Sequence, residues 1–121
     1  MSMKVSTRQV DGVTIVDCSG RITLGEGSVV LRDTIDGLLG KGQKKILLNL
    51  GDVNYIDSSG IGELVRNYLT VIKSGGTLKV VGLSDKVEEI LKITQLYKVF
   101  PEFPDEEAAL KSFPNGGPSN S

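Results

Sequence analysis

The chain has 121 residues, of which 39% are hydrophobic and 24% are charged, and its formal net charge is −1. This length suits one domain with a single hydrophobic core. A nearly neutral chain lacks the electrostatic footprint of a protein that binds nucleic acid directly or lies on an anionic membrane.

The absence of histidine and the scarcity of cysteine exclude several kinds of catalytic and metal-binding site. The sequence contains no histidine and a single cysteine, Cys18. Ser-His-Asp catalysis, Cys-His catalysis and histidine-ligated metal sites are therefore excluded, and one cysteine cannot build a zinc site. We expect no enzyme, no catalytic residues, and no metal or other cofactor. The longest fully apolar runs span three residues, which predicts no membrane insertion, no signal peptide and a cytoplasmic protein with a buried, reduced Cys18.

The N-terminal third predicts a hairpin and a helix. Loose alternation over residues 3–10 and the Asp11-Gly12 dipeptide predict two antiparallel strands, the second over 13–18. A polar connection with several glycines follows over 19–27. Apolar spacing then predicts a helix over 28–39, which Gly40 and Gly42 end.

The most informative segment, residues 45–72, predicts a buried strand, a polar turn and a helix. The strand covers 45–50 with a short continuation over 51–56, and apolar residues recur at helical spacing from Ile61. Between them lies Asp57-Ser58-Ser59-Gly60, which we name the serine elbow. The first turn of a helix has unpaired N–H groups and a partial positive charge, so a serine there is suited to carrying a phosphoryl group.

The remaining pattern completes an α/β domain. It predicts a strand over 77–82, a helix capped by Ser84 or Asp85, a short strand near 98–100 and a final helix opened by Pro104. We expect a domain over 1–112 and a flexible C-terminal tail over 113–121. The order predicts a mixed, mostly parallel sheet of four to five strands with about four helices in successive right-handed β-α units.

Sites in such sheets gather at the carboxyl ends of strands. The connection over 20–27 and the serine elbow are therefore expected to form one surface. Tyr55 is interpreted as core rather than as an exposed anchor for a partner, because it alternates with Val53.

The serine elbow has two other interpretations. In the first, the elbow is only a helix cap, but a cap needs just one of its polar residues. Of the two serines, Ser59 lies closer to the helix and is the better cap, which leaves Ser58 the freer hydroxyl. A dinucleotide-binding turn is disfavoured, because Val65 stands where Gly or Ala is needed and Asp57 would repel a pyrophosphate.

Residues 46–62, with the sequence ILLNLGDVNYIDSSGIG, resemble the signature of anti-sigma factor antagonists, members of the STAS domain superfamily. The segments 19–22, 75–82 and 105–110 follow in the order expected of such a domain. The resemblance implies a non-enzymatic regulator. Unphosphorylated, it binds an anti-sigma factor that is itself a serine kinase of the histidine-kinase-like ATPase fold, and so frees a sigma factor.

The resemblance also implies a site. The kinase would phosphorylate Ser58 and a PP2C-type phosphatase would reverse the modification. The partner-binding residues expected around Ser58 are Thr23, Leu24, Gly25, Glu26, Asp57, Ser59, Gly60 and Ile61. Many antagonists carry an acidic residue near the position of Thr23.

Two other functions are compatible with the same resemblance. The chain could be a non-phosphorylated STAS subunit of a membrane ABC lipid-transport complex, in which the elbow docks an ATPase. It could also be a subunit of a large stress-signalling assembly of STAS domains. Sequence alone separates these functions poorly.

Overall fold

The computed structural model describes residues 3–23, 25–101 and 103–114, which form an α/β domain. In chain order the elements are β1 (Lys4–Val10), β2 (Val13–Ile22), α1 (Glu26–Gly40), β3 (Lys45–Ile56), α2 (Ser58–Lys73), β4 (Thr77–Val81), α3 (Asp85–Ile93), the 3-10 turn η1 (Leu96–Lys98) and α4 (Glu106–Lys111). The predicted fold class is confirmed.

The strands form one mixed sheet in the order β1-β2-β3-β4. β1 and β2 are antiparallel and joined by the predicted Asp11-Gly12 turn, in which both residues have positive φ, as a two-residue hairpin of this kind requires. β3 pairs in parallel with both β2 and β4. The carboxyl ends of β2 and β3 therefore lie at the same edge of the sheet.

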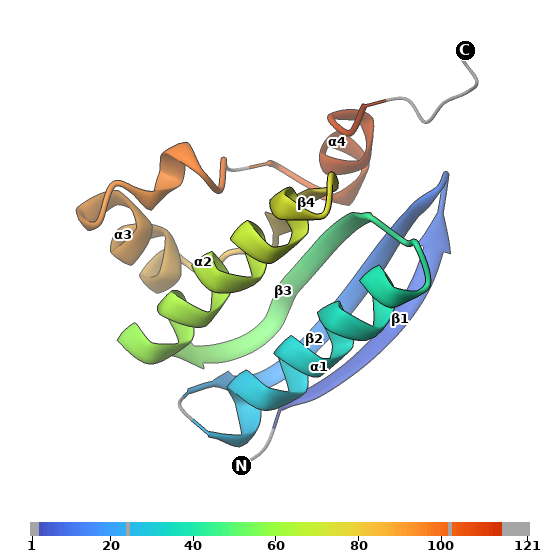
Figure 1. Ribbon diagram of the computed structural model, residues 1–121. Helices are drawn as coiled ribbons and strands as arrows, with labels where there is room; N and C mark the ends of the chain where they lie inside the picture. Colours follow the sequence, from blue (N-terminus) through green and yellow to red (C-terminus); the bar gives the residue numbers. More distant parts are fainter. Residues whose placement is uncertain (1–2, 24, 102, 115–121) are drawn as a thin grey trace.

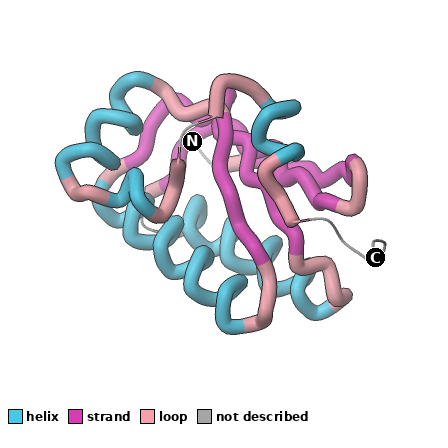
Figure 2. Tube along the Cα trace, turned by 90° about the horizontal axis from the view of Figure 1, so that it is seen from above, coloured by secondary structure: helices cyan, strands magenta, loops and turns pink. Residues whose placement is uncertain are grey.

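Helices cover the two faces of the sheet unequally. Alternate strand residues such as Val16, Leu48 and Val80 belong to a large core cluster with residues of α1, α2 and α3. The residues between them belong to a smaller cluster that includes Ala109 of α4. α1 and α2 lie side by side across one face (Figure 1), and from above the strands lie between these long helices and the short C-terminal helix (Figure 2).

β2 is longer than predicted. Residues 19–22 were assigned to a connection, but they pair with β3 up to the partners Ile22 and Ile56. The long strand β3 supplies hydrogen-bonding groups along this stretch, and irregularities beside Ser19 and Arg21 accommodate it. α1 accordingly begins at Glu26 rather than at residue 28.

The strand predicted near residues 98–100 is absent, and the described sheet has four strands. α3 ends at Ile93, and Gln95, with a φ of 62°, leads into the η1 turn. Phe100 is 1% exposed and packs edge-to-face on Tyr68, with ring centroids 5.6 Å apart. The apolar pattern here reflects an aromatic anchor under α2 instead of a strand.

The packed part of the chain also extends past residue 112. Phe113 was assigned to the flexible tail, but its side chain is 7% exposed and belongs to the cluster under α4. Pro114 is exposed, and residues 115–121 of the predicted tail lie outside the described residues.

Candidate functional site

Asp57 caps α2 and fixes the shape of the serine elbow. Its Oδ1 accepts a hydrogen bond from the Gly60 N–H at 2.8 Å, and its carbonyl oxygen accepts one from the Ile61 N–H at 2.9 Å. The expectation that Ser59 is the cap is therefore wrong. The helix begins at Ser58, three residues earlier than its apolar spacing indicated, because polar residues of a first turn do not register in that spacing.

Ser58 and Ser59 both lie exposed in the first turn of α2. Within the part of the chain that the structure describes, neither hydroxyl makes a hydrogen bond. Both are open to an incoming enzyme, beside the partial positive charge of the helix N-terminus. The argument that capping by Ser59 leaves Ser58 the freer hydroxyl does not hold, because Asp57 does the capping.

The N-termini of α1 and α2 converge on the end of β2. A Cβ atom added at Gly60 would overlap the carbonyl group of Ile22, and one added at Gly27 would lie 2.7 Å from the carbonyl oxygen of Arg21. Both helices can approach the strand this closely only because these residues lack side chains. The connection after β2 and the serine elbow thus meet, as their position at one edge of the sheet predicted.

The segment before α1 forms the other rim of this surface. Gly25 precedes the helix with a φ of 97°, and Glu26 is exposed in the first turn. The carbonyl oxygen of Thr23 accepts hydrogen bonds from both the N–H and the Oγ of Ser28, at 3.2 and 2.8 Å. Leu24, also expected at the site, lies outside the described residues.

The predicted site residues divide by exposure. Gly25, Glu26, Ser58 and Ser59 are exposed, and Thr23 and Asp57 are half-buried; Gly60 and Ile61 are buried. The last two residues therefore shape the elbow from beneath and present little surface to a partner.

Tyr55 and Arg21 stand at the same edge, and the sequence did not predict that they would be a pair. Tyr55 is 39% exposed, so its interpretation as core is wrong. Arg21 pairs with it across β2 and β3, and the guanidinium Cζ lies 4.6 Å from the centre of the tyrosine ring. The sequence pattern ended the second strand at residue 18, so Arg21 was not expected to lie in a strand. The pattern also does not give the register of β2 against β3, which makes Arg21 and Tyr55 neighbours.

A partly buried polar link joins α1 to α2. Glu63 is 6% exposed and accepts two hydrogen bonds of 3.2 Å from Arg32 of α1. Asn67, 1% exposed, donates to the Glu63 carboxylate at 3.1 Å. Hydrogen bonding to Glu63 raises the pKa of Arg32. The link ties together the two helices whose N-termini frame the site.

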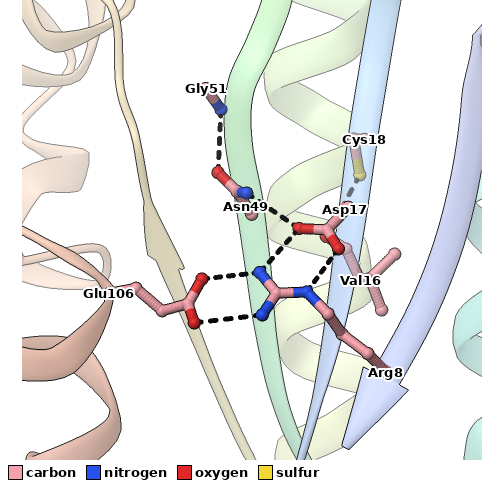
Figure 3. A network of polar contacts seen from close by, with 7 residues as sticks. All are labelled: Arg8, Val16, Asp17, Cys18, Asn49, Gly51 and Glu106. Carbon is pink, nitrogen blue, oxygen red and sulfur yellow. Dashed lines mark hydrogen bonds and ion pairs between the residues drawn. The ribbon is translucent and has the colours of Figure 1, made fainter.

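A second network crosses the opposite face of the sheet (Figure 3). Arg8 of β1 donates to both carboxylate oxygens of Asp17 and to both of Glu106 in α4, and Asn49 donates to Asp17 at 2.8 Å. The Arg8 hydrogen bonds lower the pKa of Asp17. Burial raises the pKa of the neighbouring Cys18 to about 12, so its thiol stays protonated at neutral pH.

Comparison with known proteins decides the family. Residues 4–109 match the sequence profile of the STAS domain. The chain belongs to the STAS domain family. This STAS domain is 32% identical over 96 residues to the anti-sigma-B factor antagonist of Bacillus subtilis, an alignment that covers 79% of this chain and 86% of the relative.

Other STAS relatives carry related names. The anti-sigma F factor antagonist of Paenibacillus polymyxa is 26% identical over 110 residues, covering 91% of this chain and 94% of the relative. The crystal structure of an anti-sigma factor antagonist from Mycobacterium paratuberculosis superposes with a TM-score of 0.80 at 25% identity, covering 93% and 94% of the two chains. These findings confirm the resemblance that the motif indicated.

Neither a membrane span nor a metal cluster is found in the described ranges. Among residues 3–23, 25–101 and 103–114, no helix is both long and apolar enough to cross a bilayer. The same residues contain no group of three or more acidic, cysteine or histidine side chains placed to hold a metal ion.

Proposed function

We propose that this STAS domain is a phosphorylation-controlled anti-sigma factor antagonist. The observation that carries the proposal is Ser58, exposed with an unbonded hydroxyl at the N-terminus of α2 and next to the rim formed by Gly25 and Glu26. Relatives named as anti-sigma factor antagonists, one of them 32% identical, support the same function. In its unphosphorylated form the domain binds an anti-sigma factor in the cytoplasm, and the sigma factor is released.

The partner in this proposal is an anti-sigma factor with the histidine-kinase-like ATPase fold. It transfers the γ-phosphoryl group of ATP to the Oγ of Ser58, the bond to the β-phosphate breaks, ADP leaves, and a base of the kinase takes the hydroxyl proton. A PP2C-type phosphatase hydrolyses the phosphoserine and restores the binding form. The contact surface consists of Thr23, Gly25, Glu26, Asp57 and Ser59, with Gly60 and Ile61 beneath it.

Charge at one position is enough to work this switch. A phosphoserine carries about −1.5 to −2 charges. Inside the domain, the N-terminus of α2 stabilises that charge, so the fold survives. In a complex the phosphate would stand beside the exposed Glu26, the capping Asp57 and any partner carboxylates, and like-charge contacts across an interface cost several kcal/mol. Each 1.4 kcal/mol weakens binding about tenfold.

Phosphosite mapping tests the proposal. The purified domain is incubated with ATP and each histidine-kinase-like ATPase encoded near its gene, and mass spectrometry locates the phosphate. We expect modification at Ser58, absent in Ser58→Ala and reversed by a PP2C-type phosphatase from the same genome. Phosphate only outside residues 57–60, or none with any of these kinases, would contradict the proposal and favour the unphosphorylated roles in a transport complex or a stress assembly.

A further inference from the structure

Arg21 and Tyr55 form a cation–π pair beside the proposed switch. They occupy partner positions at the ends of β2 and β3, and the guanidinium carbon lies 4.6 Å from the tyrosine ring centroid. Both side chains are exposed, Tyr55 to 39%. Stacking on the ring restricts the rotamers of a long side chain before any partner arrives, which lowers the entropy that binding has to overcome.

The donors of Arg21 are unused inside the domain. Arg8 bonds to Asp17 and Glu106, and Arg32 bonds to Glu63. Arg21, in contrast, makes no hydrogen bond or ion pair with any residue that the structure describes. A guanidinium that stacks through its face keeps its N–H edge free, and that edge matches the two oxygens of a carboxylate.

The pair adjoins the serine elbow without facing α2. Ile22 and Ile56, the next residues along each strand, are buried in the cluster under the long helices. Arg21 and Tyr55 are exposed, belong to neither core cluster and stack on each other, so they project away from the cluster under the long helices. A phosphate on Ser58, which lies on the helix side, is therefore a poorer ligand for Arg21 than a group brought by a partner that covers the edge.

We propose that the Arg21–Tyr55 pair is a charge-selective contact that receives an aspartate or glutamate side chain of the anti-sigma factor. This inference rests on the proposed function and adds a residue-level selection rule to it. Tyrosine and arginine, together with tryptophan, are enriched among the residues that contribute most of the binding energy at protein interfaces. Arg21 supplies the bond to the carboxylate, and the ring holds the guanidinium in place.

Calorimetric titration with an anti-sigma factor kinase of the same genome tests the inference. We expect Arg21→Gln to bind at least about tenfold more weakly than the parent, and Arg21→Glu more weakly still. Arg21→Lys restores part of the loss, because it keeps the charge without the planar fork. Tyr55→Phe keeps a ring for stacking and binds like the parent, whereas Tyr55→Ala is weakened.

Lys41→Gln is the matched control, since it removes one positive charge from an exposed side chain at the C-terminal end of α1, the end away from the serine elbow. It should leave the affinity unchanged, and thermal melts should show that all variants are folded. A glutamate-to-arginine exchange on the kinase that restores binding to Arg21→Glu would identify the contacting carboxylate. If the parent binds a kinase and Arg21→Glu binds it equally well, the inference is wrong while the proposed function stands. If the parent binds no such kinase, both fall.

Discussion

Among single residues, Asp57 determines the conformation of the serine elbow, because its carboxylate satisfies the Gly60 N–H at 2.8 Å. We predict that Asp57→Ala lowers the free energy of unfolding by about 1 kcal/mol, since the first turn of α2 loses its cap. Asp57→Asn keeps an acceptor and should lose much less. Ser59→Ala should have almost no effect, because no described residue bonds to its hydroxyl. Urea unfolding of the three variants measures this, and a larger loss for Ser59→Ala than for Asp57→Ala would contradict the assignment.

Gly60 and Gly62 offer a matched test of close packing at the same helix N-terminus. A Cβ at Gly60 would overlap the Ile22 carbonyl, whereas one at Gly62 meets nothing within 4 Å. We predict that Gly60→Ala destabilises the domain by about 1–3 kcal/mol through overpacking. Gly62→Ala should stabilise it by up to about 1 kcal/mol, because alanine favours the helix. Equal effects in thermal melts would show that α2 does not rest on β2 through Gly60.

For single residues, the sequence located the serine elbow but not its hydrogen bonds. The string Asp57-Ser58-Ser59-Gly60 marked the elbow, because polar and small residues interrupt two apolar patterns there. Which of three adjacent polar residues caps the helix depends on backbone dihedrals that the string does not encode. The pairing of Arg21 with Tyr55 was missed for a different reason, since the two residues become neighbours only through the parallel pairing of β2 with β3.

Among secondary-structure elements, the Arg8 network joins β1, β2 and β3 to α4 (Figure 3). The pKa of Asp17 is lowered in the folded state, chiefly by its hydrogen bonds from Arg8. Its contribution to stability is therefore complete above the ordinary aspartate pKa of about 3.9, and is lost as the pH falls through the lower folded-state value. Arg8 stays protonated throughout.

We accordingly predict a pH-dependent effect of Asp17→Asn. The variant should melt below the parent at neutral pH, and the difference should shrink as the pH falls below about 4, where the parent begins to lose the same ion pair. Melting temperatures across that range measure it. Asp33→Asn, an exposed carboxylate of α1, is the control for a general charge effect. A difference that stays constant down to the lowest pH would show that Asp17 acts through packing alone.

The elements themselves were predictable where periodicity was strong. β3, α2 and the hairpin turn follow directly from apolar runs, helical spacing and Asp11-Gly12. The predictions of secondary structure failed where tertiary contacts outweighed the local spacing of apolar residues. Residues 19–22 became strand because β3 offered them a partner, and Phe100 and Phe113 were buried by packing on Tyr68 and under α4.

For the whole molecule, the proposed switch needs no change of shape, because the surface around Ser58 is held by contacts between α1, α2 and β2. α1 and α2 are held together by Glu63, Arg32 and Asn67, and both rest their N-termini on the end of β2. A phosphate at Ser58 therefore meets a surface that is already formed. The fold class and the family followed from the sequence, because the order of elements and the 46–62 motif are properties of the chain itself.

A binding titration of the proposed anti-sigma factor kinase with Ser58→Glu is the most direct test of a charge switch at the serine elbow. We predict that the variant keeps the melting temperature of the parent, since an acid suits the first turn of α2, yet binds the kinase at least about tenfold more weakly. Ser58→Ala should bind like the parent, and Gln9→Glu, which adds the same charge on β1 near the hairpin turn, should also bind like the parent. If Ser58→Glu, folded like the parent, binds equally well, charge at the serine elbow is not the switch.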